Sequence, residues 1–342
     1  MAAVASLVVW ACGGGSSSGS SSSNTPLPGA SPKPTAAKGA GQLLIAGPDG
    51  IAQFDLGSKS SKPLISASQD GAYLLDPDVS PDGAMIAYIL QPPPKIQGKT
   101  YDAGSDAWVA NRDGSGQHAV FTHDTPNQLV RFPQWEDAGH LIAVVQEITE
   151  TGGATSVTYT LERIDIATGQ REHLLENVLA FGLSPDRKTI VYAELLPQTG
   201  ETLKTMPLAS AKLGATGTVL VGPDENLLPF NAPRYSPDGT KIAFASADQT
   251  GARADIRYVS TGEPGPSLDG LPEDIWTVDA AGSARPQRVA DIKEDLPWLA
   301  WNGDGTHIYV IGSAALYDVS MKSGAVDHIG PGSFHGQLTW TP

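Results

Sequence analysis

The chain has 342 residues and a formal net charge of −15, with 17% charged residues, 38 glycines and 27 prolines. So acidic a chain repels the phosphate backbone, which excludes nucleic acid as a partner. The single cysteine, Cys12, excludes a disulfide framework and a thiolate metal cluster. Low charge with many turn-forming residues favours many short strands over many helices.

The first forty residues differ in composition from the rest. Residues 1–12 form an apolar run that ends at Cys12 and is too short to span a bilayer. Residues 13–40 are rich in Gly, Ser and Pro, which predicts a disordered tether. An apolar run, a small residue, a cysteine and a polar tether together resemble the signal of bacterial lipoproteins. This resemblance implies that Cys12 carries a lipid anchor, with a cleaved secretory signal as the alternative.

From residue 41 onward one sequence unit recurs. Its clearest copies are Ser-Pro-Asp-Gly at 80–83 and 236–239, and Ser-Pro-Asp-Arg at 184–187, each followed by an apolar run. Pro presets φ and Gly accepts a conformation that other residues resist, so each unit predicts a tight turn between antiparallel strands. Two divergent copies follow Trp135 and Trp301.

Each of these hairpins is followed by a second one, as at 106–121 and 274–290. Two hairpins make a four-stranded antiparallel blade. Such a blade cannot cover its own faces, so blades stack around a common axis.

The two ends of this region complement each other. Residues 41–67 hold three strands without a first one, and residues 337–342, with Trp340, supply the missing strand. The sequence therefore predicts an all-β, six-bladed β-propeller over 41–342, closed by the C-terminal strand pairing into the first blade. The predicted blades are 41–67 with 337–342, 76–122, 131–176, 179–222, 232–290 and 298–330.

The Ser-Pro-Asp-Gly-x-x-Ile-Ala-Phe unit, followed by Ile-Trp-x-x-Asp-x-x-Gly, resembles the repeat of TolB-type, WD40-like β-propellers over residues 41–342. The resemblance implies an envelope-side scaffold that binds proteins or other ligands through one face and the central channel. TolB itself carries a further N-terminal α/β domain, whereas a tether stands before the first blade here. We therefore expect a shared propeller without a role in the Tol–Pal system.

A binding rim is expected on one face. The loops between second and third strands share that face with the connections between blades, and the long ones are 91–105, 147–156, 195–203 and 246–273. Long loops on a rigid scaffold commonly carry binding sites. The candidate contact residues are Tyr101, Arg253, Arg257 and Tyr258. Tolerated insertions are the alternative interpretation of these loops.

The sequence gives no catalytic constellation. No two of the seven histidines have metal-ligand spacing, and no Ser/His/Asp arrangement can be defended. The carboxylates Asp82, Asp186 and Asp238 recur once per blade on the face opposite the long loops, which indicates turn formers. We therefore predict no catalytic residue, no metal and no cofactor.

The expected function is a non-catalytic, envelope-associated scaffold. It would bind a protein partner or a small envelope ligand through the long-loop face and the channel mouth. We expect a monomer outside the cytoplasm, in the periplasm or on the outer face of the cell membrane, touching the membrane only through its lipid anchor. The alternative is a propeller hydrolase or lyase with an axial divalent metal.

Overall fold

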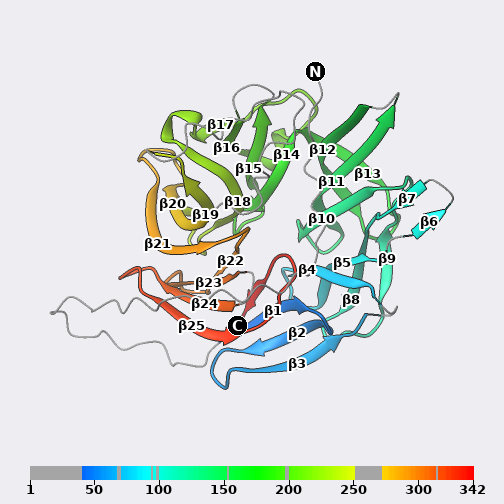
Figure 1. Cartoon of the computed structure of the whole chain (residues 1–342), viewed down its shortest axis with the longest axis horizontal. Helices are drawn as coiled ribbons and strands as arrows, with labels where there is room; N and C mark the ends of the chain where they lie inside the picture. The colour runs from blue at the N-terminus through cyan, green and yellow to red at the C-terminus, as the bar shows by residue number, and fades with distance from the viewer. Residues whose placement is uncertain are drawn as a thin grey trace.

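The computed structural model describes residues 41–67, 71–93, 95–97, 100–151, 154–196, 200–250, 272–312 and 315–342. Six four-stranded antiparallel sheets follow one another around a common axis (Figure 1). The two helices are single 3-10 turns, η1 (Leu208–Ser210) and η2 (Pro223–Glu225). No helix in the described ranges has the length and hydropathy needed to cross a membrane. The predicted fold, an all-β propeller with six blades, is confirmed.

In each blade the first strand named below lies nearest the axis and the last lies farthest from it. The first blade contains β26 (Thr339–Thr341), β1 (Gln42–Gly47), β2 (Gly50–Asp55) and β3 (Ser60–Ile65). The second contains β4 (Tyr73–Val79), β5 (Met85–Gln91), β8 (Asp106–Asn111) and β9 (His118–Phe121). The third contains β10 (Gln128–Trp135), β11 (His140–Thr151), β12 (Ala154–Asp165) and β13 (Arg171–Glu176).

The other blades follow the same plan. The fourth contains β14 (Val178–Leu183), β15 (Thr189–Leu196), β16 (Gly200–Pro207) and β17 (Thr218–Val221). The fifth contains β18 (Leu227–Tyr235), β19 (Lys241–Asp248), β20 (Glu273–Asp279) and β21 (Gln287–Glu294). The sixth contains β22 (Trp298–Trp301), β23 (His307–Ile311), β24 (Ala315–Ser320) and β25 (Val326–Pro331). A separate two-stranded hairpin, β6 (Lys95–Gln97) and β7 (Thr100–Asp102), lies between β5 and β8.

The ring closes as the sequence predicts. Strand β26 pairs antiparallel with β1, and Leu43 lies opposite Trp340. A Cβ added at Gly41 or at Gly303 would lie 2.5 Å from the Trp340 indole, so both positions need glycine for this ring to fit. Closure pairs the strand edge that the first blade would otherwise leave open.

Hydrophobic side chains fill each interface between neighbouring blades. There are six such clusters, one for each pair of neighbours around the ring. The cluster between the third blade and the second contains Trp135, whose side chain is fully buried. Each blade therefore covers one face of each neighbour and depends on both neighbours for its own core.

The repeated turns are held by their own side chains. In the second blade the Ser80 hydroxyl donates to Asp82 Oδ1 at 2.6 Å, and the same carboxylate oxygen accepts the Ala84 N–H at 3.0 Å. Gly83 follows with φ 73°, a conformation in which glycine carries no steric penalty. The turn carboxylates are thus turn formers, as the repeat indicates.

Two of the predicted long loops are strands instead. Residues 147–156 belong to β11 and β12, which pair as far as Thr151 and Ala154. Residues 195–203 belong largely to β15 and β16, which pair as far as Leu196 and Gly200. The loop interpretation was wrong for 147–156 because this segment contains Ile148 and three threonines, whose branched side chains favour strands.

Candidate functional site

Three of the axial strands carry the same bulge. Asp76, Phe132 and Ala232 each precede a proline and have positive φ, at 53°, 58° and 46°. The pairing register shifts at each of these positions. A bulge of this kind bends the strand and redirects a side chain, which here affects the centre of the ring.

Aromatic side chains occupy that centre. Phe132 in β10 and Trp298 in β22 come from opposite blades, yet their ring centroids lie 4.7 Å apart. The Arg131 guanidinium lies 4.8 Å from the centroid of the Phe132 ring. Because these rings meet on the axis, the propeller does not offer an open passage at this level, and a ligand must bind at one end of the axis or away from it.

Beside these rings, Asp76 joins three blades. Its carboxylate is fully buried and accepts the Gln337 N–H at 2.8 Å, next to the closing strand. It also accepts Arg131 Nε at 3.1 Å and the Phe132 N–H at 3.2 Å. A buried carboxylate with three donors is well compensated, so Asp76 acts as a structural link between the ring closure and the third blade.

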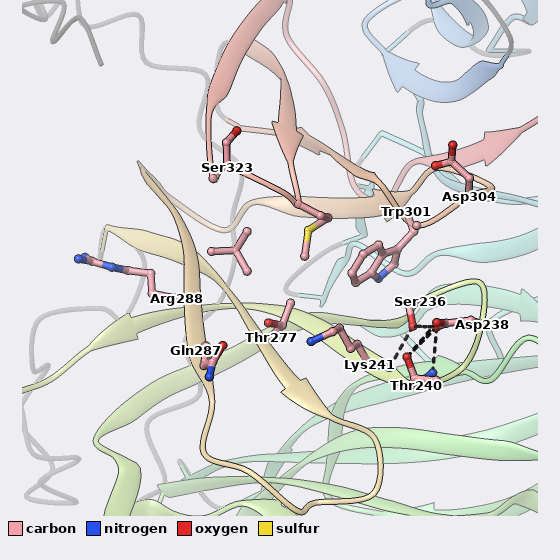
Figure 2. A pocket seen from close by; sticks show the side chains of 14 residues that line it. Ser236, Asp238, Thr240, Lys241, Thr277, Gln287, Arg288, Trp301, Asp304 and Ser323 are labelled. Atoms are coloured by element: carbon pink, nitrogen blue, oxygen red, sulfur yellow. Dashed lines mark hydrogen bonds between the residues drawn. The ribbon is translucent and has the colours of Figure 1, made fainter. Parts of the chain in front are cut away.

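A pocket in the described residues lies on the turn face, which we define as the face that carries the repeated Ser-Pro-Asp-Gly turns. It has a volume of about 450 Å³ and opens between the fifth and sixth blades. Figure 2 shows Lys241 and Thr277 on the fifth-blade side and Trp301 and Asp304 on the sixth-blade side. The side chains come from turns and strand ends of both blades, so the pocket exists only because two repeats lie next to each other.

The charges in this pocket are fixed in place. The Ser236 hydroxyl lowers the pKa of Asp238, and the Thr306 hydroxyl does the same for Asp304, so both are ionised at neutral pH. Lys241 Nζ has no ion-pair partner among the described carboxylates. The arrangement can bind a polar ligand that brings both a negative group and hydrogen-bond donors.

A second pocket of about 500 Å³ lies beside the first, between the fourth and fifth blades. The two share Asp238, so they flank the same turn, and Tyr235 and Thr205 line the second one. The Tyr235 and Thr205 hydroxyls are hydrogen bonded to each other at 2.9 Å. Together the two pockets make the turn face concave from the fourth to the sixth blade, where a ligand can bind.

The opposite face, which we call the long-loop face, holds two buried carboxyl groups. Glu201 is the second residue of β16 and accepts the Phe230 N–H at 2.9 Å. Glu273 begins β20 and accepts Asn231 Nδ2 at 2.7 Å. Burial raises the pKa of Glu201 to about 7 and that of Glu273 well above its usual range. These acids hold protons under conditions in which surface carboxyls are ionised.

The predicted rim residues are not brought together by the described part of the chain. Tyr101 lies in the hairpin β6–β7, where its backbone pairs with that of Ile96. Arg253, Arg257 and Tyr258, and also Cys12, lie outside the described residues. The turn-face pockets were missed because a regular turn looks purely structural in the sequence. The signal that could have found them is the juxtaposition of consecutive turns in a propeller.

The described ranges give no metal centre. They hold no group of three or more His, Cys, Asp or Glu side chains able to bind an ion. His140 contacts Asp137 at 2.9 Å, and His307 contacts Asp318 at 2.6 Å, both pairs being at the blade surface. Each histidine therefore makes a local contact within its own blade.

Comparison with known proteins supports the fold. No family model matches the chain, and no curated protein matches it. A chain of a nidogen–laminin complex matches with a TM-score of 0.61 and 10% identity, over 89% of this chain and 99% of that one. TolB from Acinetobacter baumannii matches with a TM-score of 0.55 and 12% identity, over 90% and 68%. A chain assigned as TolB from Agrobacterium tumefaciens gives 0.54 and 15%, over 89% and 100%.

The class that fold and comparisons define is therefore the six-bladed β-propeller. The chain's fold resembles that of the two TolB propellers, which agrees with the resemblance that the repeat indicates. At these identities the likeness concerns the fold alone, so the binding site must be argued from this chain's own residues.

Proposed function

We propose that this chain is a non-catalytic scaffold that binds a protein partner through the turn-face pocket between the fifth and sixth blades. The observation that carries the proposal is the ammonium group of Lys241, which faces a pocket of about 450 Å³ between two ionised turn carboxylates. The blocked axis supports it, because Phe132 and Trp298 leave the faces as the accessible surfaces. The proposed contact surface is therefore this pocket and not the long-loop rim or the channel mouth.

The rigidity of the pocket suits a recognition role. Asp238 Oδ1 accepts both the Thr240 N–H at 3.0 Å and the Ser236 hydroxyl at 2.5 Å, and Asp304 Oδ1 accepts the Thr306 N–H at 3.0 Å. Groups held in this way lose little conformational freedom on binding, which favours affinity. A pocket with polar walls and fixed charges contributes more to the specificity of binding than to its affinity.

Site-specific photocrosslinking in the producing cell tests this proposal. A photoreactive residue at Ser323, on the pocket wall, should give an adduct with a partner polypeptide, and one at the exposed Lys62 on β3 should not. Lys241→Glu should abolish the adduct at 323 because it reverses the charge that faces the pocket. Equal adducts at both positions, or an adduct at 323 that Lys241→Glu leaves unchanged, would contradict the proposal.

The proposed location is the extracytoplasmic side of the membrane, with the chain as a monomer held by a lipid on Cys12. The short apolar run before Cys12 and the polar tether after it support this. Metabolic labelling with a fatty acid should mark the native chain and not Cys12→Ser. Labelling of both, or of neither, would remove the anchor from the proposal while leaving the pocket untouched.

A further inference from the structure

One turn of the repeat departs from the others in a costly way. At the last position of the turn, Gly83, Gly239 and Gly305 have φ of 73°, 71° and 70°. The fourth blade has Arg187 there, with φ 59°. A side chain in this left-handed region carries a steric penalty that glycine avoids. Strained positions of this kind cluster at functional sites, so the question is what Arg187 gains.

The Arg187 side chain extends back toward the axis instead of into solvent. Its guanidinium donates to the main-chain carbonyl of Trp135 in the third blade. Arg234, two residues before the turn of the fifth blade, also faces this end of the axis. Its NH1 donates to the Phe181 carbonyl at 2.9 Å and to the Pro233 carbonyl at 2.8 Å. Main-chain carbonyls thus orient both guanidiniums.

The carbonyls that hold the two arginines lie on neighbouring axial strands, because Gln134 Nε2, next to Trp135 in the chain, donates to the same Phe181 carbonyl as Arg234 at 3.1 Å. Burial lowers the pKa of Arg234 to about 10, and the positive charge of Arg187 contributes to the lowering, while Asp78 and Asp76 oppose it. Arg234 is still cationic at neutral pH. Two guanidiniums brought together in a half-buried setting are costly unless a negative group joins them.

The nearby carboxylates are already engaged elsewhere. Asp78 accepts the Trp135 N–H at 3.0 Å and the Thr339 hydroxyl at 3.2 Å. Asp76 is bonded to Arg131 and to two main-chain amides. Within the described part of the chain neither Arg187 nor Arg234 forms an ion pair. Two arginines without an ion pair stand out on a chain of net charge −15.

We infer that Arg187 and Arg234 form an oxyanion-binding site at the turn-face end of the axis, for a carboxylate or phosphate group. A planar guanidinium offers paired N–H donors that match either oxyanion. The site is separate from the pocket between the fifth and sixth blades, so it stands whether or not that pocket binds a protein.

Thermal unfolding of the full chain tests the site, with sodium phosphate and sodium acetate as probes against sodium chloride at matched ionic strength. Saturable stabilisation by phosphate, by acetate or by both is expected, and the pattern tells which oxyanion the site accepts. Arg187→Gly restores the turn of the other blades and should weaken the apparent affinity about tenfold, as expected for the loss of one charge-assisted contact. Lys188→Gln, which removes a charge from the same exposed turn, should leave the affinity unchanged.

The inference is overturned if neither anion gives a saturable response, or if Arg187→Gly responds as the native chain does. Should Arg187→Gly fail to fold, crystals of the native chain soaked in selenate provide the second measurement. An anomalous peak between the Arg187 and Arg234 guanidiniums supports the site. Peaks confined to other places on the surface refute it.

Discussion

The carboxyl groups on the two faces of the propeller stand in opposite environments. On the turn face, hydroxyl and main-chain donors lower the pKa of Asp82, Asp186 and Asp238, which are exposed to solvent. On the long-loop face, burial raises the pKa of Glu201 to about 7 and that of Glu273 well above its usual range. Similar functional groups therefore carry charge on one face and protons on the other.

The difference between the two faces follows from how the repeat is built. The turn face is built from one short motif whose carboxylate is needed for the turn itself, so its charge pattern repeats with the blades. On the long-loop face the corresponding positions differ from blade to blade: Ser105 bonds the backbone of Val130, whereas Glu201 bonds that of Phe230. Regular turns supply a fixed electrostatic pattern, and the other face is free to diverge.

The largest expected effect comes from opening the ring, on which both faces depend. Removing residues 337–342 exposes the β1 edge and the fully buried Leu43, so cooperative unfolding should be lost. Tryptophan fluorescence during urea unfolding, with size-exclusion chromatography, measures this. Removal of the exposed Pro342 alone is the matched control and should change nothing. A truncated chain that still unfolds cooperatively would show that the two faces do not need the closed ring.

A smaller loss is expected from Asp76→Ala. The change leaves Arg131 and two main-chain amides without their buried acceptor, so the free energy of unfolding should fall by about 3–5 kcal/mol. Urea unfolding measures it, and Asp82→Ala, at an exposed turn carboxylate, should have a clearly smaller effect. Equal losses in the two variants would mean that burial does not separate the axial carboxylate from those of the turn face.

The contrast between the faces predicts a pH profile. Because the pKa of Glu201 is raised in the folded state, its stabilising contribution is complete below about 4.5 and is lost as pH rises toward 7. The loss amounts to roughly 3 kcal/mol. Urea unfolding at pH 5 and pH 8 should show this decrease in the native chain, and Glu201→Gln should remove the share of Glu201 while keeping that of Glu273, whose pKa is also raised.

The turn-face control for this profile is Asp186→Asn. The pKa of Asp186 lies below its ordinary value, so its contribution is lost only as pH falls through the acidic range. Asp186→Asn should therefore keep the native decrease between pH 5 and pH 8. If Glu201→Gln also kept it in full, the buried carboxyl would not be its source.

The smallest effect concerns the turn itself. Arg187→Gly should leave the free energy of unfolding within about 1 kcal/mol of the native value, because relief of strain and gain of unfolded-state entropy oppose each other. Gly239→Arg, the reverse change in the next blade, should be destabilising by about 1–2 kcal/mol. Equal destabilisation of the two variants would mean that the turns at 187 and 239 do not share the left-handed conformation.

Much of this architecture can be predicted from local chemistry. Ser-Pro-Asp-Gly defines a turn wherever it occurs, and Trp340 on a short terminal strand indicates the closure. The meeting of Phe132 and Trp298 could not be predicted, because it depends on blades that face each other only after the ring forms. Burial of Glu201 and Glu273 was hidden for a related reason. Each lies in a segment that the sequence predicts as a solvent-exposed loop, and only packing against β18 removes it from water.

The pairing of β26 with β1 places both ends of the propeller in one sheet, with Gln42 opposite Thr341. The order of the chain around the circle is thus arbitrary from the viewpoint of the contacts. A circular permutant that joins Gly41 to Pro342 through a short linker and starts between two other blades would keep every interface. The permutant would move the chain ends to a seam between two blades that only side-chain packing holds, whereas the native seam is a strand pair. It should therefore unfold from its ends more easily than the native order does.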